Sequence, residues 1–312
     1  MEKKKLSVST GLCYAGGDVG CNIVFGMIGT LLTLFYTDYV GISAATVGLV
    51  MLLSRCFDGF SDLVMGVIVE RTNSKWGKSR PWILFGAIPF GVTAVLAFSV
   101  PDIGQTGMLI YAYVTYILLS TSYTIVNIPM ASILPALSEN PHERTVLASC
   151  RTFFSSVGST VVSAFALTLV DKFGNGNEAL GFRIVMIIFG VIGCLVFFFC
   201  FFNTKERVMV QAEKVSLKAN ISCLLHNGPW KLFALNIVWF FGGYVIQASA
   251  VIYYFTYVVQ NTSMVQIVAT ITTLVPIVTN LLAPFLVKLT SKRNLMIGEA
   301  WHMPVSYTHL RA

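Results

Sequence analysis

Long, uninterrupted apolar segments dominate this sequence and set the strongest limit on its fold. Hydrophobic residues make up 55% of the 312 residues, charged residues make up only 11%, and the mean hydropathy is +0.75. A soluble domain carries about 25% charged residues. The segments approach the ~20 residues that a helix needs to cross a bilayer, and they do not alternate as barrel strands do. The sequence therefore predicts an all-α membrane protein.

We expect eight membrane-spanning helices. Their predicted spans are about 11–36, 44–69, 82–100, 108–137, 145–170, 182–202, 230–259 and 265–287. Pro129 and Pro135 predict that the fourth span is bent or broken near its end. The predicted domains are a six-helix bundle (1–202), a linker with room for a surface helix (203–229), two further spans with the start of a third (230–298), and a tail outside the membrane (299–312).

Basic residues lie mainly in alternate loops, which predicts the orientation of the chain. The net charge is +7, but the Lys and Arg residues form no basic block, so we expect no nucleic-acid partner. The charged loops place the N-terminus and the linker in the cytoplasm, as in a multi-pass protein of the cell inner membrane. Seven cysteines without metal-binding spacing and four histidines in loops or the tail predict no cofactor, no metal site other than one for sodium, and no enzyme activity.

Three charged residues interrupt the second apolar segment. Each of Arg55, Asp58 and Asp62 costs about 2.5–3.5 kcal/mol at the bilayer centre. Asp58 and Asp62 are four residues apart and share one helix face, and Arg55 is three residues before Asp58 and can balance its charge. We interpret this cluster as a cation site, while a purely structural ion-pair cluster is the alternative.

The charges at membrane depth leave a surplus of one carboxylate. Asp18, Asp58 and Asp62 are opposed by Arg55 and Arg151, which predicts that one monovalent cation completes the site. Sodium prefers oxygen ligands, whereas a proton would bind through the raised pKa of an aspartate, and the residues do not choose between them. The predicted cation ligands are Asp58, Asp62, Ser61 and Thr124.

The other polar residues in these helices suit a ligand with many hydroxyl groups. Carboxylates, amides and guanidinium groups bind vicinal hydroxyls, and a tyrosine ring can stack on a sugar face. The predicted substrate-binding residues are Asp18, Asn22, Asn127, Arg151 and Tyr123. The alternatives are that Asn127 bridges two helices, that Tyr123 only packs, and that Arg151 serves as the counter-ion of Asp18.

Several motifs resemble the glycoside–pentoside–hexuronide:cation symporters, a branch of the major facilitator superfamily. They are Gly17-Asp18, Phe35-Tyr-Thr-Asp38, Arg55-x-x-Asp58-x-x-x-Asp62, Arg71-Thr-x-Ser-x-Trp-Gly-Lys-x-Arg-Pro-Trp82 and Tyr123-Thr-x-x-Asn-Ile-Pro129. The resemblance implies a twelve-helix bundle, of which this chain holds about eight helices, and the tail 299–312 does not resemble the family. It also implies that Asp58, Asp62 and Thr124 bind the coupling cation, and that Asp18 and Arg151 bind the sugar.

The resemblance also implies a cytoplasmic gating loop, formed by Arg71, Gly77, Lys78 and Arg80. Asn127 stands where melibiose-transporting members carry an aspartate, so a glucuronide or a pentoside fits at least as well as melibiose. We therefore predict a monomeric secondary transporter that moves a sugar across the bilayer together with sodium or a proton. The alternatives are a membrane sugar sensor that does not transport and a non-functional fragment of such a transporter.

Overall fold

The computed structural model describes residues 8–206 and 217–254, together with short parts of 258–294. These residues form helices and no strands, which confirms the predicted all-α class. The described residues divide into two compact units, with the boundary between residues 209 and 210 and a return to the first unit from residue 276 onward.

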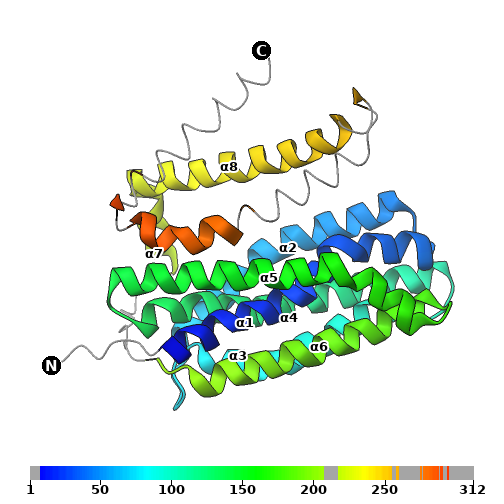
Figure 1. Ribbon diagram of the computed structural model, residues 1–312, viewed down its shortest axis with the longest axis horizontal. Coiled ribbons are helices and arrows are strands. Elements are labelled where there is room, and N and C mark those ends of the chain that lie inside the picture. Colours follow the sequence, from blue (N-terminus) through cyan, green and yellow to red (C-terminus); the bar gives the residue numbers. More distant parts are fainter. Residues whose placement is uncertain are drawn as a thin grey trace. The chain divides into compact units, whose positions relative to one another are not determined.

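Six long helices form the first unit and run alongside one another (Figure 1). They are α1 (Val8–Met27), α2 (Ala44–Arg71), α3 (Arg80–Ala97), α4 (Gln105–Leu137), α5 (Pro141–Gly174) and α6 (Glu178–Asn203). Two π-helical segments, Ile28–Leu32 and Phe35–Tyr39, follow α1. Helix α1 packs against α5 and α6, α3 packs against α4 and α6, and α2 packs mainly against α4.

Five helices of the described part are long and apolar enough to cross a membrane. They cover Ser9–Leu32, Arg80–Ala97, Gln105–Leu137, Pro141–Gly174 and Glu178–Asn203. Helix α2 is not one of the five, although its 28 residues correspond to about 42 Å. This helix carries Arg55, Asp58 and Asp62, so its apolar surface is interrupted where the sequence predicts the cation site.

Capping residues explain where several helices begin. The Ser43 side chain accepts from the Thr46 N–H at the start of α2, and the Asn140 side chain accepts from the His142 N–H at the start of α5. Helix α4 continues through Pro129 and Pro135 to Leu137, so it is not broken near its end, and the predicted bend there stays a prediction. Neighbouring helices can satisfy the backbone groups that a proline frees within a membrane bundle.

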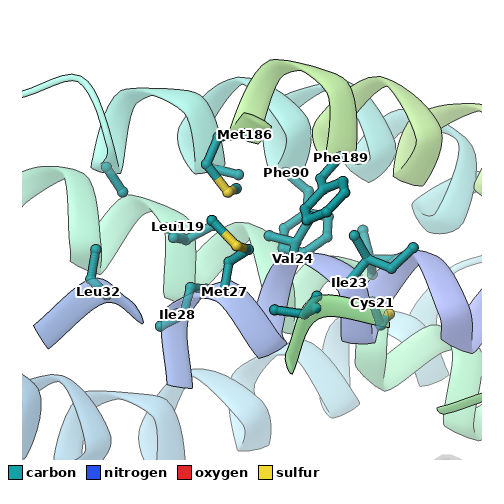
Figure 2. Close-up of a cluster of buried hydrophobic side chains, with 14 of the residues drawn as sticks. Cys21, Ile23, Val24, Met27, Ile28, Leu32, Phe90, Leu119, Met186 and Phe189 are labelled. Carbon is teal, nitrogen blue, oxygen red and sulfur yellow. The ribbon is translucent and has the colours of Figure 1, made fainter. Parts of the chain in front are cut away.

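A core of apolar side chains holds α1 in the middle of the first unit. Figure 2 shows its members from four helices: Val24 and Met27 of α1, Phe90 of α3, Leu119 of α4, and Met186 and Phe189 of α6. Gly20 permits a close approach of α1 to α6, since a Cβ atom there would lie 3.2 Å from the Gly193 carbonyl oxygen. This packing buries one side of α1 and fixes the position of Asp18 along the length of the bundle.

The second unit contains two described helices, α7 (Leu217–His226) and α8 (Gly228–Tyr253). Helix α7 lies within the predicted linker, and α8 overlaps the predicted span 230–259. Within the predicted span 265–287, the described residues include an apolar helix at Ile277–Val287. The predicted tail 299–312 lies outside the described residues, and the proposed domain limits stay predictions.

Candidate functional site

An ion pair between α1 and α5 forms the centre of the first polar cluster. Arg151 Nε donates to Asp18 Oδ1 at 2.8 Å, and Arg151 Nη2 donates to Asn127 Oδ1 of α4 at 3.3 Å. Only 6% of the Asp18 surface is exposed. Gly158 of α5 lets the two helices approach, because a Cβ atom there would lie 3.1 Å from the Val19 carbonyl oxygen. The predicted residues Asp18, Asn127 and Arg151 thus meet in one place.

Two other residues of α1 donate hydrogen bonds that order this cluster. Asn22 Nδ2 donates to the Asp18 carbonyl oxygen at 2.8 Å and to Asp18 Oδ2 at 3.4 Å. The Tyr14 hydroxyl donates to the Met130 carbonyl oxygen of α4 at 3.0 Å. Both carboxylate oxygens of Asp18 therefore have donors, and Arg151 compensates its charge.

A cavity of about 330 Å³ opens beside this ion pair. Six residues of α1, α4 and α5 line it: Asp18, Leu134, Ala148, Arg151, Thr152 and Ser155. Ligand sites usually occupy about 300–1,000 Å³ and combine apolar walls with a few polar groups. A carboxylate, a guanidinium and two hydroxyls around one cavity suit a small ligand rich in hydroxyl groups.

Tyr123 is not among the residues that line this cavity. Its ring stacks on Phe25 of α1 with the ring centroids 4.8 Å apart and an angle of 23° between the planes. It also approaches Phe90 of α3, with the centroids 6.0 Å apart. These contacts are the packing that we considered as the alternative, and sugar stacking on Tyr123 stays a prediction.

The second polar cluster lies between α2 and α4, where hydroxyl groups connect two carboxylates. Thr124 Oγ1 donates to Asp62 Oδ1 at 2.8 Å, and it lies 3.4 Å from Ser61 Oγ. Ser61 Oγ donates to the Asp58 carbonyl oxygen at 3.0 Å, and the Ser120 hydroxyl donates to Asp58 Oδ1. All four predicted cation ligands therefore lie in one cluster.

The charges in this second cluster do not balance. Arg55 Nη1 lies 3.5 Å from Asp58 Oδ2, and its guanidinium also lies over the Phe25 ring, 5.3 Å from the centroid. The Arg55 side chain is 54% exposed and that of Asp58 is 20% exposed. Among the residues that the structure describes, Asp62 has no ion-pair partner. The cluster thus keeps one carboxylate without a counter-charge.

The donor atoms of this cluster are carboxylate and hydroxyl oxygens. Such atoms suit a hard cation such as sodium, or a proton on one carboxylate. Within the described part of the chain, no group of three or more His, Cys, Asp and Glu side chains could hold a metal ion. The cluster therefore offers two carboxylates and neighbouring hydroxyls as oxygen ligands.

The predicted gating loop connects α2 to α3 and contacts the end of α6. Arg80 Nη2 donates to the Phe201 carbonyl oxygen at 2.7 Å, and the guanidinium lies 4.6 Å from the centroid of the Phe201 ring. Gly77 has a φ of +107°, which only glycine adopts readily. Arg71 is exposed at the end of α2, and the backbone N–H of Lys78 donates to the Glu206 carboxylate. Lys78 and Arg80 of this loop thus contact α6 or the residues that directly follow it.

Sequence reasoning missed several residues at these sites, namely Ser120, Glu206 and the cavity residues Leu134, Ala148, Thr152 and Ser155. Ser120 is one turn before Thr124 on α4, so the i, i+4 spacing could have placed both hydroxyls beside α2. Glu206 follows α6 and contacts the loop more than 120 positions earlier in the chain, a contact that no local pattern announces.

Comparison with known proteins identifies the family of this chain. Residues 13–311 match the family described as MFS/sugar transport protein. The match therefore extends into the segment 299–312, for which the sequence alone predicted no resemblance.

Individual relatives agree with this match. The chain is 37% identical to the isoprimeverose transporter of Lactiplantibacillus pentosus over 95% of its length, which covers 63% of that protein. It is 36% identical to the inner membrane symporter YicJ of Escherichia coli over 83% of its length, covering 56% of that protein. It is 30% identical to the glucuronide carrier protein homolog of Escherichia coli over 98% of its length, covering 71% of that protein.

The chain spans less than two thirds of the first two of these relatives. The family match covers nearly all of the chain, and the apolar helices of the first unit agree with a multi-pass membrane protein. This chain belongs to the MFS/sugar transport family, among the glycoside–pentoside–hexuronide symporters that its motifs resemble, and therefore to a family of transporters and not of enzymes.

Proposed function

We propose that the protein moves a glycoside, pentoside or hexuronide across the membrane together with one monovalent cation. Its relatives include proteins named as a symporter, an isoprimeverose transporter and a glucuronide carrier homolog, which supports sugar symport. The observation that supports coupling to a cation is that Asp62, one turn from Asp58, has no basic partner among the described residues. Transport would proceed by alternating access around a site near the membrane midplane.

The cation in this proposal binds between α2 and α4. Asp58 and Asp62 supply charge, and Ser61 and Thr124 supply neutral oxygen ligands from the same cluster. Cation binding would replace the hydrogen bond from Thr124 to Asp62 with a shared oxygen shell. Sodium and a proton both satisfy the charge count, and each is a co-substrate that leaves with the sugar.

The sugar in this proposal binds at the cavity beside Asp18 and Arg151. The ion pair fixes both side chains, so the cavity would present a preorganised wall to the sugar hydroxyls. Asn127 contacts Arg151 and would tune the guanidinium position. The charge pattern of the loops supports a cytoplasmic N-terminus, α2–α3 loop and linker, and a monomer is sufficient for this arrangement.

Uptake by vesicles tests this function. The longest reading frame that contains this chain is reconstituted, and uptake of labelled glucuronides and pentosides is measured with and without a sodium or proton gradient. We expect gradient-dependent accumulation of at least one of these sugars. Asp58→Asn should abolish the stimulation by the gradient, and exposed Asp171→Asn is the matched control.

Two outcomes would contradict the proposal. Unchanged stimulation of uptake in Asp58→Asn would remove the role of the α2 carboxylates in coupling. Saturable sugar binding without net flux, in a protein that is folded and inserted, would favour the membrane sugar sensor.

A further inference from the structure

A carboxylate just beyond α6 binds the start of α3. Glu206 Oε2 accepts from the Lys78 N–H at 2.9 Å, and Glu206 Oε1 accepts from the Ser79 N–H at 2.8 Å and the Arg80 N–H at 3.2 Å. Three successive backbone donors of the α2–α3 loop thus converge on one side chain. Two segments that are distant in sequence are joined at this point.

The local sequence explains why α3 needs this external partner. Ser79 is the N-cap residue of α3, but its side chain makes no capping hydrogen bond, and the Ser79 hydroxyl instead contacts Ser132 Oγ at 2.8 Å. The first N–H groups of a helix lack partners within the helix, and the helix dipole favours a negative charge there. The carboxylate of Glu206 takes the place of the missing capping side chain.

Residues on both sides of the contact between Glu206 and the α2–α3 loop fit its geometry. A Cβ atom at Gly77 would overlap the Glu206 carboxylate, so this side chain would have to shift if the glycine were replaced, and the positive φ of Gly77 also favours glycine. Thr204 is fully buried, and its N–H and hydroxyl both bind the Cys200 carbonyl oxygen, at 3.0 and 2.6 Å. This turn fixes the chain between the end of α6 and Glu206.

We propose that Glu206 is a positioning residue that clamps the α2–α3 loop to the end of α6. Glu206 belongs to the predicted linker, so the clamp makes the first residues of this linker and the loop move as one body. In the proposed transport cycle, a displacement of the linker would pass directly to the loop and to α2, which carries the two carboxylates. This last consequence rests on the proposed function, whereas the clamp itself does not.

Hydrogen exchange tests the clamp without any transport assay. The full chain in lipid nanodiscs is compared with Glu206→Ala, and exchange is followed at the amides of Lys78, Ser79 and Arg80. We expect these amides to be protected in the unchanged chain and to exchange at least about tenfold faster in Glu206→Ala. Glu206→Gln keeps an acceptor but loses the charge, so its exchange rates should be intermediate.

Trypsin gives a second measurement on the same samples. Cleavage after Lys75 and Lys78 should accelerate about tenfold in Glu206→Ala, while cleavage after Arg144 in α5 should not change. Glu139→Ala, which removes an exposed carboxylate from the α4–α5 loop, is the matched control. Gly77→Ala should also speed cleavage, and its effect should be smaller in the Glu206→Ala background because the overlap with the carboxylate is gone.

Exchange rates within about twofold of the unchanged chain in a folded Glu206→Ala protein would overturn the proposal. Fast exchange of all three amides in the unchanged chain would also overturn it, even if no variant folds. Helix content measured by circular dichroism shows whether each variant is folded. Neither result bears on sugar uptake, so failure of the clamp and failure of the transport proposal are distinguishable.

Discussion

The two polar clusters of the first unit contain the same kinds of charged residue but in opposite states of balance. Between α1 and α5, Asp18 is buried and Arg151 compensates its charge at 2.8 Å. Between α2 and α4, Asp58 has a longer, more exposed contact with Arg55, and Asp62 has no ion-pair partner in the described residues. A balanced pair is fixed before any ligand arrives, whereas an unbalanced one can respond to a small cation.

Packing explains the difference between the two clusters. Helix α1 is held between α5 and α6 with small residues at the contacts, so a charge on its inner face must be compensated within the bundle. Helix α2 packs mainly against α4 and presents Asp62 on an exposed surface. In the proposed function, the first cluster positions the substrate and the second binds and releases the coupling ion.

The largest effect on stability is expected from a mutation that removes the counter-charge in the balanced cluster. Arg151→Ala leaves Asp18 buried without its counter-charge, which should lower the free energy of unfolding by about 3–5 kcal/mol. Adding Asp18→Asn should recover much of this loss because the unpaired charge is gone. Thermal unfolding in detergent measures both, with exposed Lys172→Ala as the control. A loss in Arg151→Ala no larger than in the control would show that Arg151 does not compensate a buried charge on Asp18.

A smaller effect is expected from a single ligand of the unbalanced cluster. Thr124→Val keeps the shape of the side chain but removes the hydroxyl that donates to Asp62 at 2.8 Å. The cation concentration for half-maximal uptake should rise about tenfold, as expected for a lost contact to a charged group. Thr121→Val is the matched control, because the Thr121 hydroxyl donates to the Ile117 carbonyl oxygen of its own helix. Equal shifts in the two variants would exclude Thr124 as a specific ligand.

The smallest effect on uptake is expected from a mutation of Tyr123, whose ring lies between the two clusters. Tyr123→Phe retains the stacking on Phe25, so the sugar concentration for half-maximal uptake should change by less than about threefold. Uptake kinetics at saturating cation check this expectation. A change above about tenfold would instead mean that the Tyr123 hydroxyl binds the sugar directly.

The sequence predicts the helices well because apolar length reports membrane spans directly. It places helix ends less well, since those depend on single residues. The fifth helix begins at Pro141 and not near residue 145, because Asn140 caps it and Pro141 suits its first turn. The first helix is also followed by π-helical segments that apolar length cannot reveal.

The candidate site is predictable where its residues share a helix turn. Spacing alone brings Arg55, Asp58 and Asp62 together on α2, and a charge count reveals the surplus. The contact of Arg151 with Asp18 joins residues 133 positions apart, and charge balance suggested it only as one alternative. Glu206 lies 128 positions from Lys78, and neither spacing nor charge counting could identify that contact.

The central claim is that one surplus carboxylate between α2 and α4 binds one monovalent cation. Equilibrium binding of radioactive sodium and uptake of protons by the purified protein, both measured across pH at constant ionic strength, test it most directly. We predict either one sodium per chain, displaced competitively by protons, or the uptake of one proton without sodium binding. Whichever ion binds, its binding should disappear in Asp62→Asn while the protein stays folded. The same stoichiometry in Asp62→Asn as in the unchanged chain would contradict the account.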